Sequence, residues 1–452
     1  MIISFSLILL ILNIIFFVKK KYLYLFIPCM LFLPGYYGIK LNSAFPVINV
    51  SRIMFIVFFI YAFINKRNSI NIKNISIKHI PKEVLLIFGY FLLRILSNLY
   101  YVGTYGQSVK TILLIIFEQL FFLIAFYLIW PTRDELLILT KTIVWVATAF
   151  FILGFFESIT YFKIFDALYV PGTGYLNERY YRLGLLRSTT SFYMPGMFAN
   201  MCILVLPLII YMYELSRQKR YLVSVGLCIL AVIHSGSRAN IFYLIFIFIF
   251  YFLYIFRQRE KRISFLKNTV CILAGLFIFI MLASAANPYF RYFYGGSVKS
   301  VLNEIGFDFD LSEGAPADDI GYGENYKSGS QSRTRQLTGL IYTARNNLFF
   351  GLGSGAQNRG DVRYYWDGIW HKGISYDLGI VQIFCDEGVI GLIGITLLLT
   401  SFFLLCKNNR KHIPLIVMYL LSTLNTANMF SFLFVYIAMM LAYNYNLSDS
   451  DF

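Results

Sequence analysis

The segment that begins Asn287-Pro-Tyr-Phe-Arg291 and ends Gly373-Ile-Ser-Tyr-Asp377 is the longest polar stretch in a chain that otherwise consists mainly of apolar runs. It holds ten of the chain's 23 acidic residues and nine Lys or Arg. Most of the acids come first, then a basic segment, then the glycine-spaced run Gly351, Gly353, Gly355. A segment that only joined two membrane spans would not need this content, so we expect the chemistry of the chain to lie here.

The composition of the whole chain is that of a membrane protein. Its 452 residues are 58% apolar and only 14% charged, and its mean hydropathy is +0.67, which lies far outside the range of soluble domains. The net charge of +16 comes largely from short basic clusters between apolar runs. That distribution follows the positive-inside rule, so we expect a lipid bilayer and no nucleic acid as a partner.

The apolar runs predict an all-α polytopic protein, because a helix needs about 20 apolar residues to cross the hydrocarbon core. The candidate spans are 2–18, 22–37, 50–64, 84–101, 109–130, 136–156, 197–214, 221–234, 240–256, 268–286, 378–405 and 413–443. The last run is either one helix or a hairpin broken at Asn425 to Asn428. We therefore expect about 12 or 13 transmembrane helices.

The basic clusters also predict how the spans are oriented. If all of them are cytoplasmic, the segments 157–196, 235–238 and 287–377 face outward. The chain would then divide into transmembrane helices in 1–286 with the outer loop 157–196, a large outward-facing loop at 287–377, and C-terminal spans in 378–452. The long loop contains no cysteine, so we expect packing, and not disulfides, to order it. The six cysteines of the apolar runs are interpreted as small buried hydrophobes.

Arginines on the outward side run against the average charge bias and therefore need another explanation. They are Arg179, Arg182, Arg187, Arg238, Arg333, Arg335, Arg345, Arg359 and Arg363. Guanidinium forks suit phosphate oxygens, so the set suggests a site for an anionic group. The alternative is that these arginines pair with the loop's own acids, which cluster between 304 and 324.

Three patches resemble the superfamily of Wzy-type O-antigen polymerases and WaaL-type O-antigen ligases, and they occur in the order that this superfamily shows. They are Arg187-Ser-Thr-Thr-Ser-Phe-Tyr-Met-Pro195-Gly-Met-Phe-Ala199; Ser235-Gly-Ser-Arg238-Ala-Asn; and a long third patch with Ser332-Arg333, an amphipathic stretch from Leu337 to Arg345, Asn347-Leu-Phe-Phe-Gly351-Leu-Gly353-Ser-Gly355 and Asp377-Leu-Gly-Ile-Val-Gln-Ile-Phe-Cys-Asp-Glu-Gly388-Val-Ile-Gly391. The resemblance covers roughly residues 180 to 400.

This resemblance implies a membrane-embedded glycosyltransferase of the GT-C type in the bacterial inner membrane. Such an enzyme would polymerise undecaprenyl-diphosphate-linked oligosaccharide units of O-antigen, for lipopolysaccharide or a related surface polysaccharide, on the periplasmic face. A chain-length regulator protein is a further candidate partner. The resemblance implies no cofactor and no metal, and the four histidines are too scattered in the sequence to predict a metal site.

Without a metal, arginines would have to meet the charge that develops on the leaving diphosphate. Arg187, Arg238 and Arg333 are the leading candidates for this role, followed by Arg335 and Arg182, and Arg333 also counts as a candidate catalytic residue. The alternatives are an interfacial turn arginine for Arg238 and pairing with loop acids for Arg187 and Arg333.

Glycosyl transfer with inversion needs a base that takes the proton of the acceptor hydroxyl. Asp377 and His371 are the candidates, although Asp377 is also placed to cap a helix and His371 to be a surface residue. The ligase-like pattern has a histidine eleven residues before the glycine that is Gly388 here, and this chain has Asp377 there. The difference favours a polymerase. Glu118 and Glu157, in or near spans, can equally form hydrogen bonds within the bundle.

Two alternative functions stay open. One is an O-antigen ligase, which would move a finished glycan to another acceptor. The other is a flippase or transporter of lipid-linked oligosaccharides. A transporter of this kind is expected to place cationic residues along a central cavity within its spans. The gathering of arginines on one side, together with the long loop of 287–377, favours a one-sided enzyme site.

Overall fold

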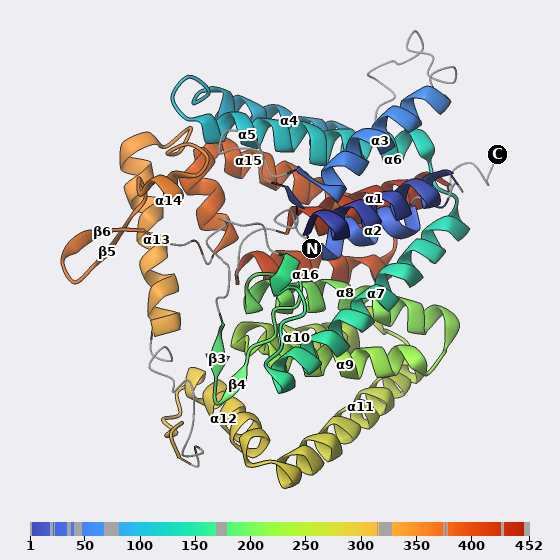
Figure 1. Cartoon of the computed structure of the whole chain (residues 1–452), viewed down its shortest axis with the longest axis vertical. Coiled ribbons are helices and arrows are strands. Elements are labelled where there is room, and N and C mark those ends of the chain that lie inside the picture. Colours follow the sequence, from blue (N-terminus) through green and yellow to red (C-terminus); the bar gives the residue numbers. More distant parts are fainter. Residues whose placement is uncertain are drawn as a thin grey trace. The chain divides into compact units, whose positions relative to one another are not determined.

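The computed structural model describes residues 2–18, 21, 23–33, 38–39, 48–66, 81–168, 179–313, 315, 328–373, 376, 378–425 and 429–446. These residues are mainly helical and include three small antiparallel pairs of strands (Figure 1). They form two compact units: unit 1 contains 1–139, 168–171 and 332–452, and unit 2 contains 140–167 and 172–331. The predicted class, an all-α polytopic membrane protein, is confirmed.

Six helices among the described residues are long and apolar enough to cross a membrane. They are Gly106–Ile129 (α5 Gly106–Leu114, the π-helix η4 Ile115–Leu120 and α6 Phe121–Ile129), α7 Arg133–Thr160, α8 Pro195–Ser216, Arg238–Ile255 (α10 Arg238–Phe250 and the π-helix η6 Tyr251–Ile255), α11 Arg259–Ala286 and α15 Gly379–Lys407. Further helices are α1 Ile2–Val18, α2 Leu23–Phe32, α3 Val50–Lys66, α4 Lys82–Leu99, α9 Arg220–His234, α16 Ile413–Thr423 and α17 Phe430–Asn446. The run 413–443 is therefore not one continuous helix, because α16 ends at Thr423 and α17 begins at Phe430. The total of 12 or 13 transmembrane helices stays a prediction.

In unit 1, α15 packs along α4 and also contacts α16 and α17, while α3 packs on α6 (Figure 1). The helix α15 is not continuous. Gly388 has φ 64° and ψ −156°, which interrupts the helical hydrogen bonds within an apolar segment. Freed backbone groups in such surroundings must find new partners.

The glycine-spaced segment after α13 supplies those partners. Val389 N donates to Leu348 O at 3.0 Å and Ile390 N donates to Phe349 O at 3.2 Å. In the other direction, Leu352 N donates to Cys385 O at 2.7 Å and Gly353 N donates to Asp386 O at 3.0 Å. The two halves of the third sequence patch are thus hydrogen-bonded to each other.

The two backbones can approach this closely only because both positions are glycine. A Cβ on Gly351 would lie 2.6 Å from Gly388 N, and a Cβ on Gly388 would lie 2.4 Å from Phe349 O. Gly351 also has a positive φ of 70°. These two glycines therefore serve backbone contact at the break in α15.

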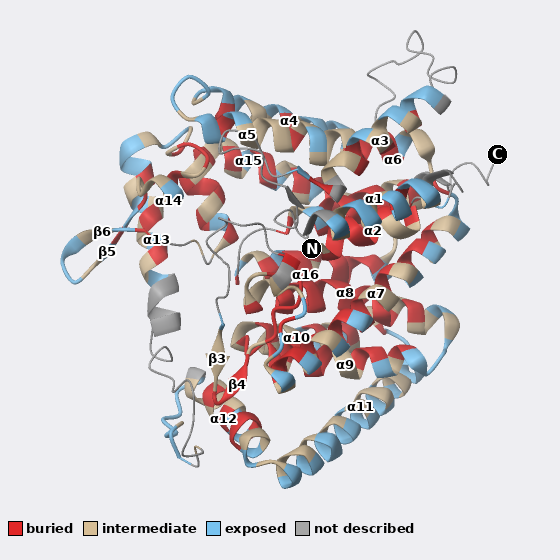
Figure 2. Cartoon of the chain, viewed as in Figure 1, coloured by how far each residue is buried: buried red, intermediate tan, exposed pale blue. Residues whose placement is uncertain are grey.

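In unit 2, α8 is almost entirely buried and packs against α9 and α10 (Figures 1 and 2). The helix α11, by contrast, has no buried residue. This corrects the interpretation of Cys271, which lies on α11 and is exposed; the other five cysteines are buried. The strands β3 Tyr181–Arg182 and β4 Leu185–Leu186 form a hairpin in the same unit, and β1 Gly38–Ile39 and β2 Ile48–Asn49 form another in unit 1.

Much of the predicted outward loop is regular structure. Its first part, α12 Pro288–Glu304, belongs to unit 2. Its later part, from Ser332 onward, belongs to unit 1 and includes most of α13 Ser328–Asn347, then α14 Ala356–Arg359, β5 Arg363–Trp366 and β6 Ile369–Lys372. The aromatic side chains Tyr292, Phe293 and Tyr294 of α12 form a buried cluster with Leu183 and Leu185. Packing, as expected, orders this part of the segment.

We predict that Gly388→Ala destabilises the protein by at least about 2 kcal/mol, because its φ and ψ lie in a region that is essentially restricted to glycine and its Cβ would meet backbone atoms. Thermal unfolding of the purified protein in detergent measures the effect. Gly275→Ala on α11 is the matched control, because nothing lies within 4 Å of its added Cβ. An unchanged melting temperature for Gly388→Ala would contradict the role of the break.

Candidate functional site

The hairpin β3–β4 positions two of the predicted arginines. Its turn residues Leu183 and Gly184 both have positive φ, 50° and 77°, as a type I′ hairpin turn requires. Leu183 tolerates this because it is anchored: its side chain is buried and packs so tightly on Gly296 of α12 that a Cβ there would lie 2.9 Å from it. The hairpin therefore has a fixed position on α12, with Arg182 on β3 and Arg187 directly after β4.

Arg182 and Arg187 converge on the turn between α9 and α10. Arg187 Nε donates to Ser235 O at 2.8 Å. Arg182 donates from Nη1 to Gly236 O at 2.5 Å and from Nη2 to Ser300 Oγ at 2.7 Å. The turn needs glycine at 236, where φ is 63° and a Cβ would lie 3.1 Å from both arginine side chains.

Arg238, the first residue of α10, completes a cluster of three arginines with Arg182 and Arg187. Burial and the nearby Arg238 guanidinium lower the pKa of Arg187 to about 10. Arg187 therefore stays protonated at neutral pH while it experiences repulsion from a like charge. Within the described residues Arg187 forms no ion pair with a carboxylate, and Ser235 O is the only hydrogen-bond acceptor of its side chain. An anion at this point would relieve the repulsion.

A buried carboxylate holds the segment that carries Arg187. Glu157, near the end of α7, accepts hydrogen bonds from Thr189 N at 3.1 Å, Thr189 Oγ1 at 2.7 Å and Thr190 N at 2.7 Å. Ser188 Oγ donates to Gly154 O at 2.5 Å. These bonds join α7 to the turn after Arg187, so Glu157 positions the first sequence patch. Sequence analysis noted this carboxylate without assigning it a role.

The histidine before the turn is also held on both sides. His234 Nδ1 lies 2.9 Å from Ser158 Oγ and Nε2 lies 2.8 Å from Tyr294 OH. His234 O accepts from Ser188 N at 3.1 Å. The ring therefore ties α9 to α7 and α12 beneath the arginine cluster, and both of its nitrogens are occupied.

The remaining predicted site residues belong to unit 1. Arg335 on α13 lies over the Trp366 ring, with Cζ 5.4 Å from its centroid. His371 on β6 stacks on the same indole at 3.7 Å between centroids and 10° between planes. The structure thus brings Arg335 and His371 to one tryptophan. Arg333 lies within α13, but its side chain and the whole of Asp377 are outside the described residues.

Arg359 is an arginine whose charge is neutralised by a carboxylate, which Arg187 lacks among the described residues. Arg359 Nε donates to Asp361 Oδ2 at 2.7 Å, its amino groups donate to Ser354 O and Leu352 O, and its Cζ lies 3.7 Å from the Tyr105 ring centroid. For Arg359 the alternative of pairing with a loop acid is therefore confirmed.

Sequence analysis missed an ion pair between α4 and α15. Arg94 Nε donates to Glu387 Oε2 at 2.7 Å, a second bond joins Nη2 to Oε1, and Nη1 donates to Tyr90 OH at 2.9 Å. Both charged side chains are under 10% exposed. Tyr90 OH in turn donates to Gln119 Oε1 at 2.8 Å on the π-helix η4. The sequence signal that could have indicated this ion pair is Arg94, a single arginine within the otherwise apolar run 84–101.

A second carboxylate lies beside this pair. Asp386 Oδ1 accepts from Tyr376 OH at 3.2 Å, and its Oδ2 lies 3.4 Å from Gly355 N. Burial, with Asp386 adjacent, raises the pKa of Tyr376. In the part of the chain that the structure describes, no group of three or more His, Cys, Asp or Glu is placed to hold a metal ion.

One family model matches a region of the chain that contains several of the elements described above. Residues 223–396 match a family model described as O-antigen ligase. The matched region contains the turn at Ser235 to Arg238, α12, the glycine-spaced segment and the break at Gly388. The match supports the O-antigen ligase and polymerase superfamily and a multi-pass membrane enzyme related to O-antigen. No curated protein matches the chain.

The first sequence patch lies outside the match with the O-antigen ligase family. Arg182, Arg187 and Glu157 precede residue 223, yet they contact the matched turn directly or through a short chain of bonds. The geometry therefore extends the site beyond the region that the family model covers.

We predict that Glu157→Gln lowers the free energy of unfolding by about 2 kcal/mol. The charged acceptor is lost, and the amide NH₂ group faces a backbone N–H that needs an acceptor. Thermal unfolding and glycan transfer in membranes should both decline. Glu135→Gln on the same helix is the control, because Glu135 accepts one exposed hydrogen bond from Thr132 N. Equal behaviour of the two variants would remove Glu157 from the site.

We predict that Glu387→Met lowers the free energy of unfolding by about 3 to 5 kcal/mol, since it leaves Arg94 buried and uncompensated. The double variant Arg94→Met with Glu387→Met should recover much of that loss, because it removes both charges. A double-mutant cycle of unfolding free energies tests this. A double variant as unstable as the sum of the two single variants would mean that the charges do not act as a pair.

Proposed function

We propose that the chain polymerises oligosaccharide repeat units linked to undecaprenyl diphosphate, building O-antigen or a related surface polysaccharide on the periplasmic face of the bacterial inner membrane. The arginine cluster of Arg182, Arg187 and Arg238 would bind the donor diphosphate. The observation that carries this proposal is Arg187, which is held rigidly beside another guanidinium and has no carboxylate partner among the described residues.

The chemistry that this cluster suits is departure of a diphosphate. As the acceptor hydroxyl attacks the anomeric carbon, the bond to the diphosphate oxygen breaks and negative charge grows on the leaving group. Guanidinium groups fixed in a partly dehydrated site stabilise that charge without reorganising. The Glu157 and Ser235 contacts supply the fixed geometry. Arg333 and Arg335 stay further candidates for the same task.

The proton of the acceptor hydroxyl needs a base, and Asp377 and His371 stay the candidates. His371 is stacked on Trp366, and its buried Nε2 has no hydrogen-bond partner among the described residues. The neighbouring rings of Tyr342, Tyr365 and Trp370 lie 5.2 to 5.4 Å apart and offer apolar faces for a sugar. Within unit 1, these features make the hairpin β5–β6 and α13 candidates for contact with a sugar.

An O-antigen ligase is the second candidate, because the matching family model carries that description. Asp377 at the position of the ligase-like histidine favours the polymerase. A chain-length regulator fits as a partner of a polymerase only.

Arg187→Ala should lower the rate of glycan transfer by about 10²- to 10³-fold, the effect of losing one preorganised donor to a developing charge. Arg187→Lys should recover part of it, since the charge returns without the fork. Arg345→Ala is the matched control, because Arg345 is an exposed arginine on α13. All variants are compared at equal membrane expression in a strain that lacks its own copy.

Glycan ladders distinguish the alternatives. Accumulation of single-repeat lipopolysaccharide by Arg187→Ala supports a polymerase. Polymer that is made but left unattached to its acceptor indicates a ligase. Lipid-linked units retained on the cytoplasmic face would indicate a flippase. A full ladder from Arg187→Ala would contradict the proposed role of the cluster.

A further inference from the structure

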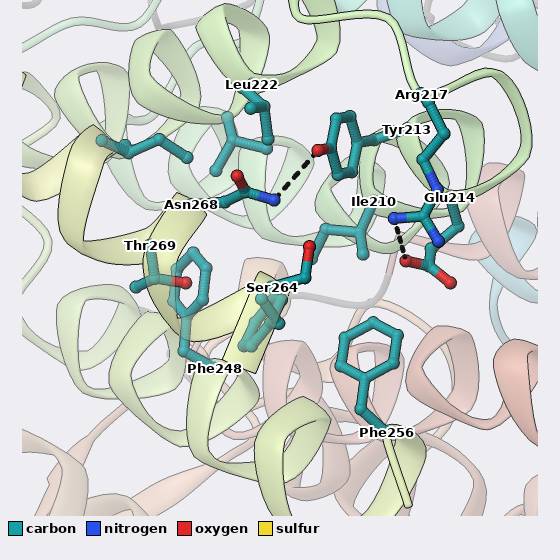
Figure 3. A pocket seen from close by; sticks show the side chains of 13 residues that line it. Ile210, Tyr213, Glu214, Arg217, Leu222, Phe248, Phe256, Ser264, Asn268 and Thr269 are labelled. Carbon is teal, nitrogen blue, oxygen red and sulfur yellow. Dashed lines mark hydrogen bonds and ion pairs between the residues drawn. The ribbon is translucent and has the colours of Figure 1, made fainter. Parts of the chain in front are cut away.

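Unit 2 contains a pocket that the proposed transfer reaction does not use. It is lined by residues of α8, α9, α10, α11 and the segment that follows η6 (Figure 3). Apolar side chains form most of its wall, including Ile210, Phe248, Phe265 and Ile272. Its polar groups are few: Asn268 Nδ2 donates to Tyr213 OH at 2.9 Å, and Arg217 Nη1 lies 3.5 Å from Glu214 Oε1.

The pocket and the arginine cluster lie at opposite ends of α8, α9 and α10. The helix α8 follows the Arg187 patch and reaches the pocket near its end, and α10 starts at Arg238 and reaches it at Phe248. The helix α9 runs in the opposite sense, from Leu222 at the pocket to His234 beneath the cluster. Since α8 has 22 residues, it is about 33 Å long, close to the thickness of the hydrocarbon core. The pocket therefore lies at the other membrane interface.

The chain segments 214–220 and 257–268, next to the pocket-lining residues, are strongly basic, and Arg217 lines the pocket itself; we call these two segments the basic rim. Together they hold eight Lys or Arg and two acids. One acid, Glu214, pairs with Arg217 and has a side chain only 11% exposed, so it presents little negative charge outward. Lys219, Arg257 and Arg259 are exposed. The enclosed space is only about 20 Å³, so the pocket is a shallow apolar hollow. Beside such a rim it is complementary to a lipid whose acyl chain lies along it and whose head group is anionic.

The exposure of α11 supports a lipid as the occupant. This helix has no buried residue, and its side chains Leu266, Val270 and Leu273 are more than half exposed. It borders the pocket through Phe265, Asn268 and Ile272. A helix with this pattern faces acyl chains over most of its surface, so a lipid reaches the pocket directly from the bilayer.

We infer that the pocket binds an anionic phospholipid, with one acyl chain against Ile210, Phe248 and Phe265 and its phosphate at the basic rim. Arg217 and Arg259 would pair with the phosphate, and Asn268 and Ser264 would hydrogen-bond to ester oxygens. The site is independent of the glycan transfer that we propose for the arginine cluster.

The experiment uses the purified full-length chain after delipidation in detergent. Native mass spectrometry and thermal unfolding are recorded with added phosphatidylglycerol or phosphatidylcholine of identical acyl chains. We expect phosphatidylglycerol to bind at least tenfold more tightly. Equal binding of the two lipids, or preferential binding of polyprenyl phosphate, would overturn the inference.

Two variants address the two parts of the site. Arg217→Gln with Arg259→Gln should reduce the preference for phosphatidylglycerol about tenfold, and Ser264→Phe should fill the cavity and reduce binding of its acyl chain. The matched control Lys407→Gln removes an exposed charge at the end of α15 and should change nothing. Retained binding in both pocket variants would contradict the site, and because neither alters the arginine cluster, failure here leaves the transfer assay unaffected.

Discussion

A helix that is broken inside an apolar region must have every freed backbone group satisfied, and unit 1 is built around one such break. At Gly388 the N–H groups of Val389 and Ile390 lose their helical partners and bond to Leu348 O and Phe349 O. Carbonyls before the break receive bonds from Leu352 N and Gly353 N. Ser97 of α4 supplies the bond to Glu387 O at 2.9 Å.

This arrangement explains why charged groups lie beside the break. Ser97 of α4 donates to the backbone carbonyl of Glu387. Arg94, one helical turn before Ser97 on α4, neutralises the Glu387 side chain. The pair is costly to desolvate, so its value lies in geometry: it fixes the register of α4 against α15.

In unit 2, the side chains of several arginines lie close together, so their like charges repel each other. Glu157 does not neutralise Arg187; it binds Thr189 and Thr190 instead. The carboxylate therefore stabilises the backbone that carries the arginine and leaves the guanidinium available. A direct ion pair would have left Arg187 with less capacity to bind an anion.

Sequence patterns predicted the membrane class, because this depends on local hydropathy. They left the run 413–443 open between one helix and a broken one, and the structure has two helices there. Arg182, Arg187 and Arg238, which the sequence singled out as candidate diphosphate ligands, meet at one turn. Their binding of a diphosphate stays a prediction. Pairings across long separations were not accessible: Arg94 and Glu387 are 293 residues apart, and nothing in either run indicates the other.

The same limit applies to the segment 287–377, whose long-range contacts composition does not show. It contains the helices α12 and α13, of 17 and 20 residues. The aromatic side chains of α12 pack on Leu183, which comes from a hairpin more than 100 residues earlier.

Arg359 and Arg187 differ in whether the charge of the side chain is neutralised among the described residues. Arg359 has a carboxylate, backbone carbonyls and an aromatic ring as partners, so its charge is fully accounted for within the fold. Arg187 has one carbonyl and a like-charged neighbour, and its pKa is lowered to about 10 by burial and by that neighbour. Two such cations held together repel each other, which supports our proposal that an anionic ligand binds there. A lipid-linked diphosphate is the ligand that we propose, because it carries its charge at the membrane surface.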